Sequence, residues 1–163
     1  MRRPGAPVLD ATDARIVRLL AADGRQSVNR LADATNVSRA TAYHRLERLR
    51  EAGVITGFRA TIDPAKTGLS VTALILVNVA QHHWQAVRDD LLGLPGLDQL
   101  LFTSGEFDMV LLVRVPDIAA LRDVVLDRLH GMEHVRSTQT IFVLDEHRAD
   151  WVGSAFAPDV EPQ

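Results

Sequence analysis

The segment that decides the fold is Ser38-Arg39-Ala40-Thr41-Ala42-Tyr43-His44-Arg45-Leu46-Glu47-Arg48-Leu49, and it is followed by Gly53. Serine is a preferred N-cap residue and glycine a typical helix stop, so the segment predicts a helix from Ser38 to about Ala52. The small or apolar side chains at 42, 46 and 49 fall at i, i+4 and i+7, on one buried face. The opposite face carries four arginine or histidine side chains and is strongly cationic.

Two shorter helices are predicted upstream of this segment. Asp10 is an N-cap candidate for a helix that ends before Asp23-Gly24-Arg25, and Ser27 can cap a second helix that runs to about Thr35. Asn36 tolerates the left-handed backbone that a tight turn between helices requires. The three segments together predict a helix-turn-helix whose third helix can enter the major groove of DNA.

Base-reading side chains must lie near the N-terminal end of such a helix. This places four residues at the floor of the groove: Arg39, Ala40, Tyr43 and His44. Arg39 can make a bidentate contact with guanine. Six further residues are predicted to contact phosphates, which adds affinity without sequence information: Arg25, Ser38, Thr41, Arg45, Arg48 and Arg59.

The rest of the chain alternates between strand and helix patterns. Residues 54–62 are β-branched and alternating, and predict a small wing and a linker strand. Strands are then expected at 73–79, 97–102, 107–115 and 135–144, with helices at 84–92 and 118–129. This βαββαβ order predicts a ferredoxin-like antiparallel sheet with both helices on one face. The chain is therefore an α+β protein with predicted parts 1–60 (helix-turn-helix), 61–70 (linker), 71–145 (sheet domain) and 146–163 (tail).

Charge divides the chain in the same way. Residues 1–60 hold 11 basic and 6 acidic side chains, a formal charge of +5, whereas residues 61–163 hold 7 and 15, a charge of −8. DNA should therefore contact only the first 60 residues. Cysteine is absent, which excludes disulfides, thiolate nucleophiles and cysteine-based metal sites. With neither a bilayer-length apolar run nor a secretory signal, we expect a cytoplasmic location and no membrane partner.

The sequence also resembles a known family. Residues 38–49 followed by Gly53-Val54-Ile55 are similar to the Lrp/AsnC signature, and so are Leu9-Asp10-x-x-Asp13 and Asp63-Pro64-x-x-x-Gly68. The resemblance covers about residues 8–145. It implies a winged helix-turn-helix followed by a ferredoxin-like domain of the RAM type, in a transcriptional regulator that binds double-stranded DNA. It further implies an amino acid or similar small effector, and a homodimer formed through the sheets that assembles into tetramers or octamers.

The resemblance places the effector between subunits, near the turn that joins the two central strands. That turn holds Thr103, Ser104, Gly105, Glu106, Phe107 and Asp108, and the last strand adds Ser137, Thr138 and Thr140. Gly105 would let the backbone approach a ligand, and Asp108 can accept a hydrogen bond from an ammonium group. We expect no cofactor and no catalytic residue. We also expect no metal site, because His130 and His134 have helical spacing but lack a third ligand.

Two alternatives to this regulator remain open. Sirohaem decarboxylases are similar to Lrp/AsnC proteins and use the same two-domain plan, but such an enzyme has no use for a cationic recognition helix. A scaffold whose helix-turn-helix binds protein would show no salt-dependent affinity for DNA.

Overall fold

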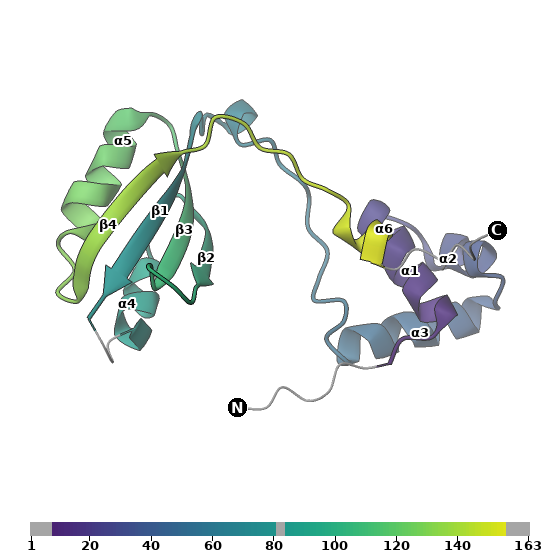
Figure 1. The fold of residues 1–163 in the computed structure, drawn as a ribbon. Helices are drawn as coiled ribbons and strands as arrows, with labels where there is room; N and C mark the ends of the chain where they lie inside the picture. Colours follow the sequence, from purple (N-terminus) through teal and green to yellow (C-terminus); the bar gives the residue numbers. More distant parts are fainter. Residues whose placement is uncertain (1–7, 81–83, 156–163) are drawn as a thin grey trace, which may run out of the picture. The chain divides into compact units, whose positions relative to one another are not determined.

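The computed structural model describes residues 8–80 and 84–155, and the chain divides into two compact units (Figure 1). The first unit comprises residues 1–61 together with 148–163, and the second residues 62–147. Residues 1–7 and the end of the predicted tail, residues 156–163, lie outside the described residues. No described helix has both the length and the apolar character that a membrane span requires.

The first unit is built on three helices, α1 (Ala11–Ala22), α2 (Val28–Thr35) and α3 (Arg39–Glu51). Each begins at the predicted cap, since the side chains of Asp10, Ser27 and Ser38 accept a hydrogen bond from a backbone N–H three residues on. Asn36 ends α2 in the left-handed conformation at φ 56°. The tight turn that the sequence predicted is therefore confirmed.

One apolar core joins the three helices. Ile16 and Leu20 of α1 pack with Leu31 of α2 and Leu49 of α3, and all four are buried. Leu46 packs at the edge of this cluster, and Ala42 is fully buried. The predicted inner face of α3 is confirmed.

The predicted strand in the wing region does not form. Within the described ranges, residues 54–62 pair with no other strand. The N–H groups of Val54 and Ile55 instead donate to the carbonyl of Leu49 and close the end of α3. The ring of Phe58 lies beside Gly24, at the turn between α1 and α2. The β-branched pattern was misleading because a strand also requires a partner, and none lies beside this segment.

The second unit is a four-stranded antiparallel sheet with the order β2-β3-β1-β4. The strands are β1 (Val71–Val79), β2 (Leu97–Phe102), β3 (Met109–Val115) and β4 (Val135–Phe142), with α4 (Trp84–Leu91) between β1 and β2. Helix α5 (Ile118–Asp123) continues as a π-helical stretch, η2 (Val124–Leu129). A 3₁₀ turn, η1 (Ala65–Thr67), precedes β1. The predicted ferredoxin-like order is confirmed.

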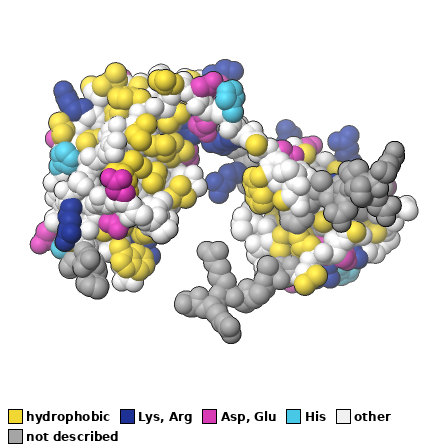
Figure 2. All heavy atoms as spheres, in the orientation of Figure 1, with side chains coloured by type: hydrophobic (Ala, Val, Ile, Leu, Met, Phe, Trp, Pro, Cys, Tyr) yellow, Lys and Arg dark blue, Asp and Glu magenta, His cyan; other side chains and the backbone are white. Residues whose placement is uncertain are grey.

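Both helices cover the same face of the sheet. Alternate residues of β1 and β3, among them Ile75 and Leu111, are buried against Val87 of α4 and Leu121 of α5. The other face is open and apolar. Leu74, Leu76, Val110 and Leu112 lie there in register, flanked by Leu101 and Ile141. Figure 2 shows hydrophobic side chains gathered over the strands of this unit. We call these six residues the open face.

One end of the open face is closed by a buried arginine. Arg114 of β3 donates to Asp98, Thr72 and Glu146 over 2.8, 3.2 and 2.7 Å. Burial acts to lower the pKa of Arg114, but the hydrogen bonds to Asp98 and Glu146 outweigh burial and raise it. Arg114 therefore stays charged and holds the chain just after β4 against the sheet.

The tail does not end at the sheet unit. Residues after Glu146 lead to a short helix, α6 (Trp151–Ala155), which packs on α1 of the first unit. Asp150 caps this turn by accepting from the N–H of Gly153. The chain therefore passes from the first unit to the second and returns.

The turn before β2 contains a glycine whose substitution tests the packing of the sheet unit. Gly96 has φ 76°, and a Cβ there would lie 2.3 Å from the carbonyl oxygen of Arg114. Gly68 has a similar φ of 87°, but a Cβ there would meet nothing within 4 Å. We expect Gly68→Ala to cost about 1 kcal/mol of unfolding free energy from strain alone, and Gly96→Ala about 2–4 kcal/mol. Urea denaturation measures both, and equal losses would contradict the clash.

Candidate nucleic-acid interface and effector cavity

The N-terminal half of α3 presents the predicted base-reading residues to solvent. Arg39, Ala40, Tyr43 and His44 are all exposed, and Tyr43 keeps 52% of its surface accessible. The rings of Tyr43 and His44 pack edge to face, with centroids 6.1 Å apart. The first turn of α3 contains no acidic residue. This surface therefore combines positive charge, hydrogen-bond donors and an aromatic ring without a neighbouring carboxylate on the same turn.

The predicted phosphate contacts fall into two groups. Arg25 and Arg59 are exposed. Ser38 and Thr41 form the cap of α3, where the Ser38 hydroxyl accepts from the N–H of Thr41 and the two hydroxyls lie 2.8 Å apart. These four side chains lie at the surface of the first unit and can contact a phosphate without breaking an ion pair in the described part of the chain.

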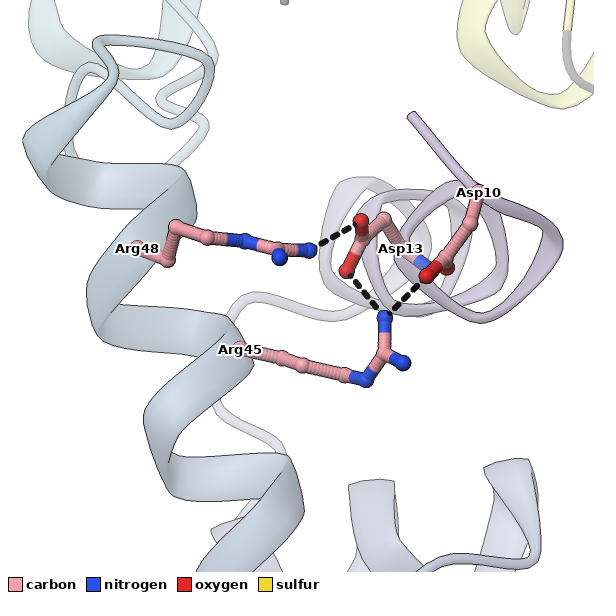
Figure 3. A network of polar contacts seen from close by, with 4 residues as sticks. All are labelled: Asp10, Asp13, Arg45 and Arg48. Atoms are coloured by element: carbon pink, nitrogen blue, oxygen red, sulfur yellow. Dashed lines mark hydrogen bonds and ion pairs between the residues drawn. The ribbon is translucent and has the colours of Figure 1, made fainter. Parts of the chain in front are cut away.

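Arg45 and Arg48 have carboxylate partners in this structure (Figure 3). Asp13 of α1 is only 1% exposed, and its two oxygens accept from Arg45 over 2.9 Å and from Arg48 over 2.5 Å. Arg45 also donates to Asp10, the cap of α1. Two arginines one turn apart on α3 thus hold the first turn of α1.

This network shifts the pKa values of Asp10 and Arg45. The hydrogen bond from Arg45 lowers the pKa of Asp10 below its ordinary value of 3.8, and the carboxylates of Asp10 and Asp13 raise that of Arg45. Because the folded-state pKa of Asp10 is depressed, its contribution to stability is present above the unfolded pKa and is lost as the pH falls through the folded pKa. The network is intact at neutral pH.

The network changes how the predicted DNA contacts are weighted. Arg45 is partly covered and shared between two carboxylates, whereas the Arg48 side chain is 61% exposed and uses one nitrogen for Asp13. The assignment of Arg48 to a phosphate stays an untested prediction, and so does that of Arg45, although the two carboxylate partners of Arg45 favour a structural task for it. Sequence reasoning treated Asp13 only as part of a motif and missed its pairing with α3, because the crossing of two helices cannot be derived from residue spacing.

A cavity of about 730 Å³ lies at one end of the sheet. It is bounded by the end of β1, the start of α4, the turn between β2 and β3, and the start of β4. The described residues that line it are Asn78, Val79, Ala80, Trp84, Phe102, Thr103, Glu106, Asp108, Met109, Arg136 and Ser137. Its size lies within the range of small-molecule sites in proteins.

Four of the nine predicted effector residues line this cavity: Thr103, Glu106, Asp108 and Ser137. Ser104, Gly105 and Phe107 belong to the same turn but are not among the lining residues. Thr138 instead bonds to His130 over 3.0 Å, and Thr140 pairs with Ile75, whose side chain faces the helices. Because directly opposed residues share a face, both threonines lie on the helix-covered side of β4, and neither is among the described residues that line the cavity.

Asp108 has a structural partner as well as a cavity position. One carboxylate oxygen accepts from the backbone N–H of Val79 over 2.9 Å, and the backbone N–H of Asp108 donates to Val77. Thr103 closes the same turn by donating to the carbonyl of Phe107. The turn between β2 and β3 is therefore fixed to the end of β1, and the rim of the cavity is rigid on that side.

Sequence reasoning missed seven of the eleven described lining residues, among them Trp84, Phe102 and Arg136. Asn78 pairs with Ser137 but Val79 pairs with Val135, so Arg136 is the extra residue of a β-bulge. Bulges re-aim a side chain away from the regular alternation. Trp84 and Phe102 meet edge to face with centroids 5.5 Å apart, across 18 residues of sequence. The sequence offered one signal for this aromatic pair: Trp84 begins a predicted helix and Phe102 ends a predicted strand.

Comparison with known proteins identifies the family. Residues 9–56 match a family model described as winged helix-turn-helix DNA-binding, and residues 72–150 match one described as Lrp/AsnC ligand binding domain. The chain is 31% identical over 141 residues to the HTH-type transcriptional regulator FL11 of Pyrococcus furiosus, covering 86% of this chain and 93% of that protein. This chain belongs to the Lrp/AsnC family of transcriptional regulators.

Two further proteins are similar to this Lrp/AsnC protein in sequence or structure. The HTH-type transcriptional regulator AldR of Mycobacterium tuberculosis is 34% identical over 143 residues, covering 86% of this chain and 80% of AldR. A transcriptional regulator from Neisseria meningitidis, solved as a complex with L-Met, superposes with a TM-score of 0.82 at 27% identity. That match covers 87% of this chain and 94% of the other.

The Asp13 network yields a stability test. Asp13→Asn keeps the size of the side chain but removes the charge that Arg45 and Arg48 share, so we expect the unfolding free energy to fall by about 1–3 kcal/mol. Asp33→Asn, an exposed carboxylate on α2, is the matched control and should change stability by less than about 0.5 kcal/mol. Urea denaturation followed by far-UV circular dichroism measures both. A loss no larger in Asp13→Asn than in the control would contradict the network's role.

Proposed function

We propose that this protein binds operator DNA through the N-terminal half of α3 and that an amino acid in the cavity of the sheet unit modulates this binding. The observation that carries the proposal is the division of charge and exposure in the first unit. The buried face of α3 joins the core, its C-terminal half is tied to α1, and Arg39, Tyr43 and His44 are left exposed at its beginning.

The chemistry of the exposed half of α3 supports sequence-specific recognition. Arg39 supplies a planar pair of donors that match guanine, while Tyr43 and His44 supply a second row one turn on. Arg25, Arg59, Ser38 and Thr41 supply phosphate contacts around that row. Several phosphate contacts make affinity fall steeply with salt, which separates this function from a protein-binding scaffold.

The cavity supports an amino-acid effector. Arg136 can pair with a carboxylate and Glu106 with an ammonium group, and both line the cavity. The Neisseria meningitidis relative was solved with L-Met, which is an amino acid. The relatives named above are transcriptional regulators, and we propose no catalytic role for this chain. Turnover of a tetrapyrrole by the purified protein would instead favour the decarboxylase alternative.

We further propose that two copies pair through the open face. An uncovered patch of Leu74, Leu76, Val110 and Leu112 on one sheet is larger than the scattered apolar residues of an ordinary surface. A two-fold dimer would present two recognition helices to half-sites about one helical turn apart on DNA. We also propose that such dimers assemble into tetramers or octamers. The proposed location is the cytoplasm, where the protein would meet its DNA.

The recognition half of α3 yields the first functional test. Arg39→Ala should weaken binding to the gene's own upstream DNA by about 1–3 kcal/mol, because a bidentate base contact is lost. Arg50→Ala is the matched control, since Arg50 lies in the last turn of α3 and pairs with Glu47. Its affinity should stay within about twofold of the unmodified protein's. Electrophoretic mobility shifts measure both, and equal affinities for the two variants would overturn the assignment.

The open face yields the second functional test. Leu76→Asp places a charge in the middle of the proposed dimer interface, where it would be desolvated, so we expect dissociation to monomers. Gln85→Asp, at an exposed position of α4, adds the same charge away from that face and should leave the assembly unchanged. Sedimentation velocity reads the mass of both variants. A Leu76→Asp protein that still forms dimers would contradict pairing through this face.

A further inference from the structure

The cavity contains an aromatic wall that an amino-acid backbone does not need. Trp84 and Phe102 both line the cavity, and they remain 44% and 50% exposed. Phe102 is opposite Met109, on the helix-covered side of β2, so the pair lies apart from the open face. The edge-to-face packing holds both rings in place. Two fixed, half-exposed rings beside charged groups form a surface that an apolar ligand group would cover.

The charged groups of the cavity suit the backbone of an amino acid. Among the described residues, three charged side chains line the cavity: Glu106, Asp108 and Arg136. One oxygen of Asp108 already accepts from the backbone N–H of Val79. Glu106 and Arg136, one negative and one positive group, form no ion pair within residues 8–80 and 84–155. This pair matches the ammonium and carboxylate groups of an amino acid.

We infer that the effector is a zwitterionic amino acid with an aromatic side chain, which packs on Trp84 and Phe102. The inference rests on the amino-acid effector proposed above and names its class. A third ring extends the edge-to-face pair, and each such contact contributes beyond the area that it buries. Alanine would leave the aromatic wall uncovered.

The volume agrees with a large side chain. A cavity of about 730 Å³ exceeds what any single amino acid fills, so size excludes no aromatic residue. Affinity for a small amino acid in such a space would depend on Glu106 and Arg136 alone. The preference among amino acids is therefore set by the aromatic wall, and Trp84 and Phe102 determine specificity rather than affinity for the backbone groups.

Isothermal titration calorimetry on the full-length protein tests this inference with L-Phe, L-Trp, L-Ala, L-Lys and L-Asp. We expect L-Phe or L-Trp to bind at least about tenfold more tightly than the other three, which is the ratio that burying an aromatic side chain provides. Phenylpropanoate, which lacks the ammonium group, and phenethylamine, which lacks the carboxylate, should each bind at least about tenfold more weakly than L-Phe.

Two variants separate the wall from the charged groups. Phe102→Leu should reduce the preference for L-Phe over L-Ala while L-Ala binding persists, and Arg136→Gln should weaken every amino acid. The unmodified protein alone decides the matter if a variant fails to fold. Equal affinity for L-Phe, L-Ala and L-Lys would overturn the aromatic class and leave the amino-acid effector standing. Absence of binding by all amino acids would overturn the proposed effector itself.

Discussion

The carboxylate of Asp13 is the constraint on which the first unit depends. It is buried, and a buried carboxylate is tolerated only when it is paired and hydrogen-bonded. Arg45 and Arg48 supply that pairing from α3, and Asp10 joins the same group while it caps α1. Because the two arginines are one turn apart, they fix both the position and the rotation of α3 about its own axis. The exposed arc of α3 then falls on Arg39, Tyr43 and His44.

In the second unit, the strand order determines where the cavity forms. Its strand order brings the end of β1, the turn after β2 and the start of β4 to one end of the sheet, so residues from four separate segments enclose one cavity. Asp108 ties the turn between β2 and β3 to β1. The bulge in β4 brings the guanidinium group of Arg136 to the cavity. The cavity is thus largely preformed by the backbone. Trp84 and Phe102 line this frame from α4 and from the end of β2.

The fold could be predicted from the sequence because its signals are local. The caps at Asp10, Ser27 and Ser38, the left-handed Asn36 and the alternation of strands each depend on neighbours within a few residues. The wing strand was predicted wrongly because pairing depends on a second segment. The roles of Asp13 and Arg45 were missed for the same reason, as were Arg136 at a bulge and Trp84 beside Phe102. Long-range contacts of this kind follow from helix crossing and strand register, which residue spacing does not specify.

In the proposed function, the basic residues of α3 have two different tasks: the beginning of the helix contacts DNA, and Arg45 holds α1. The salt dependence of DNA affinity for Arg45→Gln, measured together with its unfolding free energy, distinguishes these two tasks. Loss of a phosphate contact lowers the salt slope by about one. We predict that Arg45→Gln keeps the slope of the unmodified protein and loses about 1–3 kcal/mol of stability. A slope lower by about one, with stability unchanged, would contradict the account.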